Sequence, residues 1–283
     1  MPSAPELVTG LAALASLPSV YLRIREELDA PDGSLTAVAT AISGDPATTA
    51  RLLHVVNSAF YGYGRPIETA DRAVVLLGLQ QAHDLVLAMS LGSTFARLDP
   101  AQLDLARFWR RSVMRGLAAR AIGRARKLPS AERLFVVGLL SDLGHLVMYQ
   151  VAPDAAAASR AASEESGERL HEAERRIVGC DSAEVGAALM ERWKLPGAFA
   201  RITGAQFNPR LGGEHAYEAA IVHVAAHLAA ADLNRDTTET ALAGIDPVIW
   251  SQLDMSPEAL AKIREDAELN LAGYIALFFP PRR

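Results

Sequence analysis

Apolar residues along this chain recur three and four positions apart, the spacing that places them on one face of an α-helix. Alanine- and leucine-rich segments carry this pattern through most of the 283 residues, and the two-residue alternation of β-strands is almost absent. No segment repeats at the period of a solenoid protein. The pattern predicts an all-α protein built from packed helical bundles.

Several helix starts are marked by a capping residue or by a proline at the first helical position. Ser34 precedes "LTAVATAIS", and Asp45 with Pro46 precedes "ATTARLLHVVNSAF". Further helix starts are predicted at Pro129–Ser130, Pro153–Asp154 and Pro196. Asn57 lies at a predicted helix end, where its amide can satisfy free backbone groups.

The N-terminal part of the chain predicts a helical subdomain of its own. Turn formers over residues 60–70 predict a loop, and a long helix is predicted over residues 79–97. The helical pattern breaks at residues 98–100. We therefore expect an N-terminal subdomain at residues 1–99 and a second bundle with a C-terminal helical extension at residues 100–283. Within this second bundle, "NPRLGGEH" predicts a loop.

The segment "FVVGLLSDLGHLVMYQ", residues 135–150, predicts one buried helix, yet it carries Ser141, Asp142 and His145 in its middle. Carboxylate and imidazole groups serve as metal ligands and as general acids and bases. The segment is therefore a working site, the remnant of a metal site, or a polar seam in a core helix.

Composition narrows the class of protein. Half of the residues are apolar and 22% are charged, which is typical of a soluble globular protein, and the net charge of −5 disfavours a nucleic-acid partner. The single cysteine, Cys180, excludes an intramolecular disulfide and suits a reducing compartment. The chain starts without a signal-peptide pattern, and its longest weakly polar run is too short to span a bilayer. We expect a cytoplasmic protein without a membrane segment.

Three segments in this order resemble an HDOD domain, the HD-related output domain of bacterial signalling proteins: "LPSVYLRIREEL", "AISGDPATTARLLHVVNSAFYGYGRPIETADRAVVLLGLQQAHDLVL" and "GLLSDLGHLVMYQ". "CDSAEVGAALMERWKLPGAF" and "ITGAQFNP" extend the resemblance, which covers residues 17–233. It implies an all-α fold in which an N-terminal helical subdomain packs on a bundle like that of the HD phosphohydrolases.

The resemblance also implies a metal site whose ligands this sequence has lost. HD phosphohydrolases hold divalent metal with a histidine, an adjacent His-Asp pair and a further aspartate. Only the aspartate of the pair remains, as Asp142, and the other matching positions carry Arg111, Ser141, Ser182, Gln206, Phe207 and Ala226. Because a guanidinium cannot ligate a metal, we expect this vestigial pocket to hold no metal, no cofactor and no catalytic residue.

A buried carboxylate normally has a cationic partner. Arg111 stands where the first histidine of the HD motif would be, so we expect an Arg111–Asp142 ion pair that replaces the metal as a structural link. Loss of Arg111 would then cost stability without removing an activity.

Three histidines are weaker candidates for a metal site. His145 lies three residues after Asp142, where a hydrogen-bonded core histidine is the simpler interpretation. His223 and His227 have the i, i+4 spacing of zinc ligands, but no adjacent glutamate supplies a base. Ordinary histidines at the edge of the core are the simpler interpretation of this pair.

The segment "LDLARFWRRSVMRGLAARAIGRARK" predicts a basic helix on which Arg107, Arg111 and Arg115 share one broad face. The simpler interpretation is a solvated face whose aliphatic stems cover neighbouring residues. The alternative is a contact with a phosphate group or a nucleotide, because guanidinium groups bind phosphate bidentately.

Taken together, the residues predict a non-catalytic module for signal transduction or regulation. It would act by binding a signalling partner protein or a small ligand. A divergent metal-dependent phosphohydrolase is one alternative, which bound metal would favour. A nucleotide second-messenger binding module is the other, which stabilisation by a ligand would favour.

Overall fold

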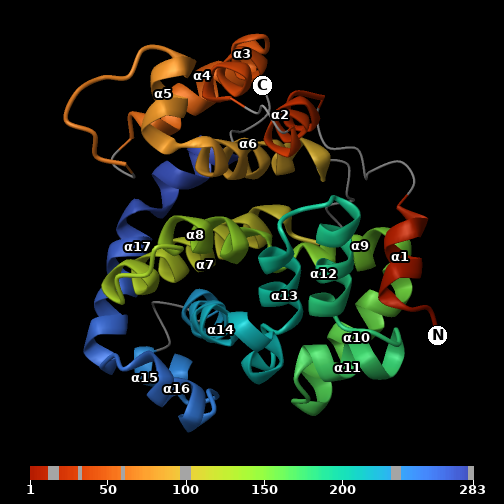
Figure 1. Ribbon diagram of the computed structural model, residues 1–283. Helices are drawn as coiled ribbons and strands as arrows, with labels where there is room; N and C mark the ends of the chain where they lie inside the picture. Colours follow the sequence, from red (N-terminus) through yellow and green to blue (C-terminus); the bar gives the residue numbers. More distant parts are fainter. Residues whose placement is uncertain (12–18, 31–33, 59–60, 96–102, 231–236, 280–283) are drawn as a thin grey trace. The chain divides into compact units, whose positions relative to one another are not determined.

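The computed structural model describes residues 1–11, 19–30, 34–58, 61–95, 103–230 and 237–279. Within these ranges the regular elements are α-helices and one 3-10 helix, and no β-strand occurs (Figure 1). The predicted all-α fold class is therefore confirmed. The chain forms two compact units, and each unit combines segments that are far apart in the sequence.

The first unit comprises residues 1–15 and 97–272. Its elements are α1 (Ala4–Gly10), α7 (Leu105–Ala125), α8 (Ala131–Leu140), α9 (Leu143–Val151), α10 (Pro153–Ser166), α11 (Leu170–Ile177), α12 (Ser182–Arg192), α13 (Gly197–Gly204), the 3-10 helix η1 (Pro209–His215), α14 (Ala216–Ala230), α15 (Thr238–Leu242), α16 (Pro247–Leu253) and most of α17 (Pro257–Phe278). α7 packs along α8 and α14, and α12 packs against α9 and α13. Trp109 and Trp193 are buried within this unit, as expected of core side chains.

The second unit comprises residues 16–96 and 273–283. Its elements are α2 (Ser19–Asp29), α3 (Leu35–Ser43), α4 (Pro46–Val56), α5 (Ala70–Leu77), α6 (Leu79–Thr94) and the end of α17. α3 packs against α2 and α5, and α6 packs against the same two helices. Buried side chains such as Tyr21, Ile24 and Leu52 form its core.

The helix starts marked in the sequence occur where they were predicted. The Ser34 hydroxyl accepts a hydrogen bond from the Ala37 N–H at 3.1 Å, and the Asp45 carboxylate accepts one from the Ala47 N–H at 3.1 Å. At the end of α4, the Asn57 amide donates to the Ile67 carbonyl and accepts from the Ile67 N–H, each over 2.7 Å. Asn57 therefore ends one helix and holds the following loop against it.

The predicted domain boundaries differ from the two units at both ends of the chain. Residues 98–100, where the boundary was placed, lie outside the described residues. α1 groups with the first unit and residues 273–283 with the second, whereas the prediction assigned both the other way. The reason at the N-terminus is packing, because α1 buries Leu7 and Val8 and lies against α9 and α12.

The single helix predicted over residues 135–150 is wrong, because the chain turns at Ser141 and Asp142 between α8 and α9. The Ser141 hydroxyl donates to the Gly138 carbonyl at 2.9 Å, and the Gln206 amide donates to the Ser141 carbonyl at 2.7 Å. These side chains satisfy backbone groups that the broken helix leaves free, so the break can lie inside the core. The loop predicted at "NPRLGGEH" is also wrong, since Pro209–His215 forms η1.

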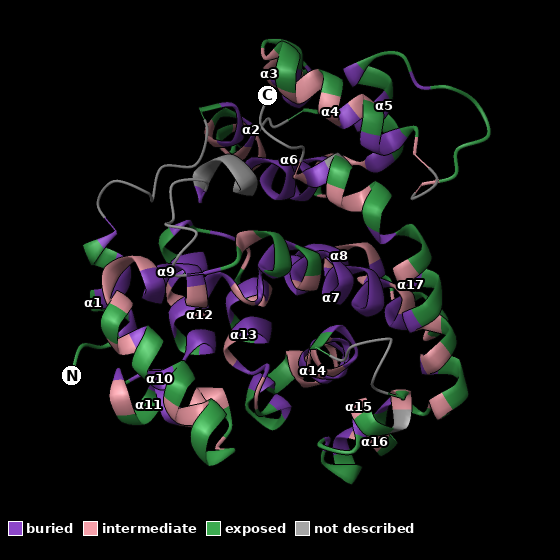
Figure 2. Ribbon diagram, turned by 180° about the vertical axis from the view of Figure 1, so that it is seen from behind, coloured by how far each residue is buried: buried purple, intermediate pink, exposed green. Residues whose placement is uncertain are grey.

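By length and composition alone, two apolar segments of the described chain are long enough to cross a membrane. They are Ala131–Val151, which contains the break, and the sharply bent pair α5 and α6. In the most apolar stretch of Ala131–Val151, 78% is buried inside the protein. Figure 2 shows α8 and α9 mostly in the colour of buried residues. This burial is what a core helix of a soluble protein shows.

Candidate functional site

A buried ion pair between Arg115 and Asp142 lies at the centre of the candidate site. Arg115 donates from Nη1 to Oδ1 and from Nη2 to Oδ2 of Asp142, each over 2.7 Å. The Arg115 side chain is 6% exposed and the Asp142 side chain 14% exposed. Such bidentate, charge-assisted pairs are roughly twice as strong as neutral hydrogen bonds.

Two more side chains bind the Arg115 guanidinium. Nη1 also donates to Ser141 Oγ at 2.7 Å and to Gln206 Oε1 at 3.1 Å. Ser141, Asp142 and Gln206 are all positions at which the family resemblance implies metal ligands. One guanidinium therefore connects three of the positions at which the resemblance implies metal ligands.

The predicted partner of Asp142, Arg111, lies one helical turn before the observed one. The reason is a close helix contact: a Cβ added to Gly138 of α8 would lie 3.0 Å from Gly116 Cα of α7. This contact brings Arg115, the residue before Gly116, next to the turn that carries Asp142. Arg111 makes neither a hydrogen bond nor an ion pair with Asp142, so the predicted Arg111–Asp142 pair is wrong.

A second row of polar contacts leads from Asp142 to α11 and α12. His145 Nδ1 lies 3.8 Å from Asp142 Oδ1, and His145 Nε2 lies 3.0 Å from Glu174 Oε1. Glu174 is 3% exposed, and its other carboxylate oxygen accepts a hydrogen bond from the Ser182 N–H at 2.9 Å. Ser182, predicted in the pocket, contributes to this row and does not line the cavity described below.

The charges in this row stabilise one another. Burial alone would raise the pKa of Asp142, but Arg115 and then His145 outweigh burial and hold this pKa below its ordinary value. Burial would raise the pKa of Glu174 as well, and His145 reverses that shift. Burial would lower the pKa of His145, whereas Glu174 and Asp142 raise it. The arrangement therefore favours the protonated, positively charged form of His145 between the carboxylates of Asp142 and Glu174.

A cavity of about 550 Å³ borders the Arg115–Asp142 pair, and we call it the arginine cavity. Arg107, Arg111 and Arg115 line it from α7, which confirms that they share one face of that helix. Other elements contribute Asp104, His145, Arg160, Glu164, Arg169, His171, Phe207, His223, Ala226 and His227 to its lining. The structure thus brings together most of the side chains singled out in the sequence.

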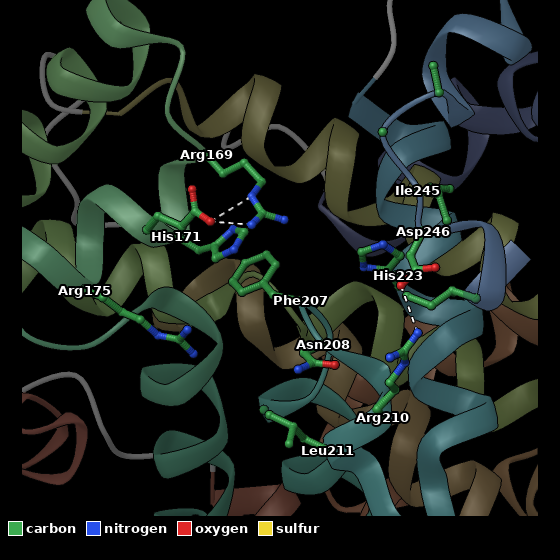
Figure 3. A pocket seen from close by; sticks show the side chains of 15 residues that line it. Arg169, His171, Arg175, Phe207, Asn208, Arg210, Leu211, His223, Ile245 and Asp246 are labelled. Atoms are coloured by element: carbon green, nitrogen blue, oxygen red, sulfur yellow. Dashed lines mark hydrogen bonds and ion pairs between the residues drawn. The ribbon is translucent and has the colours of Figure 1, made fainter.

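A second cavity of about 590 Å³ adjoins the arginine cavity and shares Arg169, His171, Phe207, His223 and Gly244 with it. The rings of His171 and Phe207 are stacked, with centroids 4.2 Å apart and planes at 10°. Figure 3 shows the two side chains next to each other. In the same view a dashed line joins Arg210 to Asp246, and this contact is 3.0 Å long. The stacked pair forms an aromatic wall common to both cavities.

His223 and His227 present proton acceptors rather than charges. His223 Nδ1 lies 2.7 Å from the Gln206 carbonyl and His227 Nδ1 lies 3.0 Å from the His223 carbonyl. A carbonyl oxygen can only accept, so Nδ1 carries the proton and Nε2 keeps its lone pair. Burial lowers the pKa of His223 to about 4 and also lowers the pKa of His227, so both rings are neutral at pH 7.

The weak metal candidates do not form one cluster. In the part of the chain that the structure describes, no group of three or more His, Cys, Asp or Glu side chains is placed to hold a metal ion. His145 is engaged by Glu174, while His223 and His227 lie together with ring centroids 4.6 Å apart.

Sequence reasoning missed several members of the site, among them Arg160, His171 and Glu174. The role of Arg115 in holding Asp142 was also missed. One signal was present, because Gly116 and Gly123 interrupt the predicted helix, and an interior glycine indicates close packing. Glu174 had no such signal, since only the packing of α11 brings it to His145.

The sequence model of the HDOD domain matches residues 14–209. An uncharacterized protein of Treponema pallidum (strain Nichols) is 27% identical over 184 residues, which cover 65% of this chain and 35% of that protein. This chain thus spans about a third of the curated relative that it matches.

Solved structures have the same fold. A candidate phosphohydrolase from Shewanella amazonensis has a TM-score of 0.76 and 24% identity, and the match covers 99% of both chains. An HDOD domain protein of unknown function from Geobacter sulfurreducens has a TM-score of 0.69 and 23% identity, covering 94% of this chain and 96% of that one. A candidate signal transduction protein from Marinobacter aquaeolei has a TM-score of 0.68 and 20% identity, covering 93% of this chain and 58% of that one.

Proposed function

This chain belongs to the HDOD domain family, and we propose that it is a non-catalytic regulatory module of signal transduction whose former metal site is closed by Arg115. One observation carries the proposal: the guanidinium of Arg115 binds both carboxylate oxygens of Asp142, the acidic residue that remains of the HD motif. The carboxylate is therefore already neutralised by a permanent cation of the protein itself.

A divalent metal ion would have to displace this guanidinium. Arginine has donors but no lone pair, and it stays protonated at any physiological pH. Displacement would leave Arg115 buried without its counter-ion, which costs about 3–5 kcal/mol in comparable buried pairs. The same metal would lie next to a positive charge and would find glutamine and serine in place of histidine.

A divergent phosphohydrolase stays the main alternative. It would need other ligands, and His223 with His227 offers two neutral imidazole nitrogens next to the cavity. The described residues supply no third ligand to this pair. We therefore favour binding over hydrolysis as the function of the pocket.

Regulation through a signalling partner in the cytoplasm is part of the proposal. The similarity to a candidate signal transduction protein supports this context by fold alone. The helical scaffold, without the chemistry of the HD enzymes, can still bind a protein or a small ligand, because function depends on the site and not on the fold.

The test combines metal analysis with a phosphoesterase assay. The purified chain is measured by native mass spectrometry and then assayed with bis(p-nitrophenyl) phosphate in the presence of Mn²⁺, Mg²⁺ or Zn²⁺. We expect a metal-free mass and no turnover above that of Asp142→Asn. Turnover that disappears in Asp142→Asn but persists in Glu164→Gln, a carboxylate of the same cavity, would overturn the proposal.

A further inference from the structure

The two adjoining cavities differ in how many of their arginines form ion pairs with acidic side chains. In the second cavity, Arg169 pairs with Glu172, Arg175 with Asp181 and Arg210 with Asp246. Figure 3 shows the first and the last of these contacts as dashed lines. A charged ligand would have to break those pairs, so this cavity offers little to an anion.

The arginine cavity carries positive charge that the described residues leave unbalanced. Five arginines and three acidic residues line it, in a chain whose net charge is −5. Arg169 is already paired with Glu172, and Arg115 with Asp142, which leaves Arg107, Arg111 and Arg160 beside the carboxylates of Asp104 and Glu164. Of the acidic residues, Asp142 is taken by Arg115, and Asp104 caps α7 by accepting from the Arg107 N–H at 3.0 Å. After these pairs the lining keeps one more arginine than carboxylate, in a concave place on a protein whose net charge is −5.

Arg111 is the critical cation of this cavity. Its side chain is partly buried, its Nε is buried, and this nitrogen makes no hydrogen bond to a described residue. Burial lowers the pKa of Arg111, and Arg115 and Arg107 lower it further, although Asp142 opposes them. Among the described residues Arg111 forms no ion pair, although it lines the cavity, so its charge is available to an anion there.

The three arginines of α7 become more buried in the order in which they follow one another along the helix. Arg107 is exposed, Arg111 is half-buried and Arg115 is buried. The spacing of four residues places them in one row on the lining. An anion that meets Arg107 first can be held by Arg111, while Arg115 stays bound to Asp142.

Acceptors lie in the same cavity. The Nε2 lone pairs of His223 and His227 belong to neutral rings whose tautomers are fixed by carbonyl groups. These nitrogens cannot bind an anion, but they can accept from a hydroxyl or amino group of a ligand. The cavity volume of about 550 Å³ is within the range of small-molecule sites.

We infer that the arginine cavity binds a small phosphorylated molecule that also carries hydroxyl or amino groups. Arg111 and Arg107 hold the phosphate oxygens, and Nε2 of His223 and His227 accepts hydrogen bonds from the ligand. This inference rests on the proposed function in one respect, namely that Arg115 holds Asp142 and no metal occupies the pocket.

The test measures the affinity of the full chain for inorganic phosphate and for ribose 5-phosphate by isothermal titration calorimetry. We expect saturable binding of one equivalent of each, which weakens as salt is added. Arg111→Gln should weaken both affinities by about tenfold or more, because charge-assisted hydrogen bonds to phosphate are lost. Arg124→Gln is the matched control on the same helix, since Arg124 pairs with Glu132 outside the cavity and should bind like the wild type.

A second variant tests the acceptors separately. His227→Phe removes one Nε2 lone pair and should lower the affinity for ribose 5-phosphate while leaving inorganic phosphate unchanged. Equal losses for both ligands would overturn the assignment of His227 as a ligand acceptor. Circular dichroism of each variant verifies that it is folded.

Failure of this inference can be told apart from failure of the proposed function. No binding of either phosphate by the folded wild type, or equal weakening by Arg111→Gln and Arg124→Gln, overturns the anion site and leaves the non-catalytic proposal intact. ³¹P spectra of the titrated samples follow the phosphate ester itself. Its hydrolysis with added Mn²⁺ would overturn the metal-free premise and, with it, this inference.

Discussion

At the scale of single residues, Arg115 holds together the polar side chains at the centre of the pocket. Its guanidinium donates to Ser141, Asp142 and Gln206 at distances between 2.7 and 3.1 Å. A metal ion at the same place would provide charge and coordination that can be exchanged for substrate. Arginine provides the charge alone, and because it is part of the protein chain it offers no coordination position that a substrate could take.

Removal of the Arg115 guanidinium leaves a buried carboxylate without its partner. We expect Arg115→Gln to lower the free energy of unfolding by about 3 kcal/mol, measured by urea denaturation at pH 7. Arg111→Gln should cost less than about 1 kcal/mol, because Arg111 has no ion pair to Asp142. The double variant Arg115→Gln/Asp142→Asn should lose clearly less than the sum of its single variants. Equal losses for Arg111→Gln and Arg115→Gln would show that the observed pair does not carry the stability.

The row from Asp142 through His145 to Glu174 predicts a pH dependence of stability. The pKa of His145 is raised, so its contribution is complete below the unfolded value of about 6.5 and disappears as the pH rises through the folded pKa. The lowered pKa values of Asp142 and Glu174 act in the other direction, and their contribution disappears in acid.

His145→Gln should therefore cost more stability at pH 6 than at pH 9, measured by urea denaturation at both values. NMR titration of the ring should also show the pKa of His145 falling towards about 6.5 in Glu174→Gln. A cost of His145→Gln that is the same at pH 6 and pH 9 would contradict this account.

At the scale of elements, close helix contacts position the site. A Cβ added to Gly144 of α9 would lie 1.9 Å from the Ser182 carbonyl oxygen of α12 and 2.8 Å from Gly186 N. The backbones of α9 and α12 therefore touch where the row from His145 to Ser182 crosses between helices. Contact between α7 and α8 at Gly116 and Gly138 has the same effect on Arg115 and Asp142.

Gly144→Ala should force α9 away from α12 and destabilise the fold by about 1–3 kcal/mol or more. Gly273→Ala is the control, because nothing lies within 4 Å of its added Cβ in α17. Alanine is the better helix former there, so this variant should gain about 0.5–1 kcal/mol. Thermal unfolding followed by circular dichroism measures both. Similar melting temperatures for the two variants would mean that the tight contact can relax.

At the scale of the whole molecule, α1 belongs to a unit whose other helices begin after residue 97. Leu7 is 3% exposed and Val8 2% exposed, and α1 packs against α9 and α12. The first residues of the chain therefore support the helices that carry His145 and Ser182.

Leu7→Ala should lower the free energy of unfolding by about 2–4 kcal/mol, because it leaves a cavity between α1 and its neighbours. Leu269→Ala, at a position 77% exposed, should change it by less than about 0.5 kcal/mol. Urea denaturation compares the two variants. If Leu7→Ala were as mild as Leu269→Ala, the assignment of α1 to this unit would be wrong.

The sequence by itself determined the local features of this protein. The caps at Ser34 and Asp45, the helical spacing of apolar residues and the shared face of Arg107, Arg111 and Arg115 all depend on residues within a few positions of one another. Family motifs likewise indicated the all-α fold.

Only the tertiary structure decided which of these side chains meet. Three arginines on one face are equivalent in a helical projection, and the contact of Gly116 with Gly138 selects Arg115 as the partner of Asp142. The break at Ser141 is stabilised by Gln206, 65 residues later, and Glu174 reaches His145 from another helix. Such contacts depend on how helices distant in sequence pack, and hydrophobic spacing within one helix carries no information about that packing.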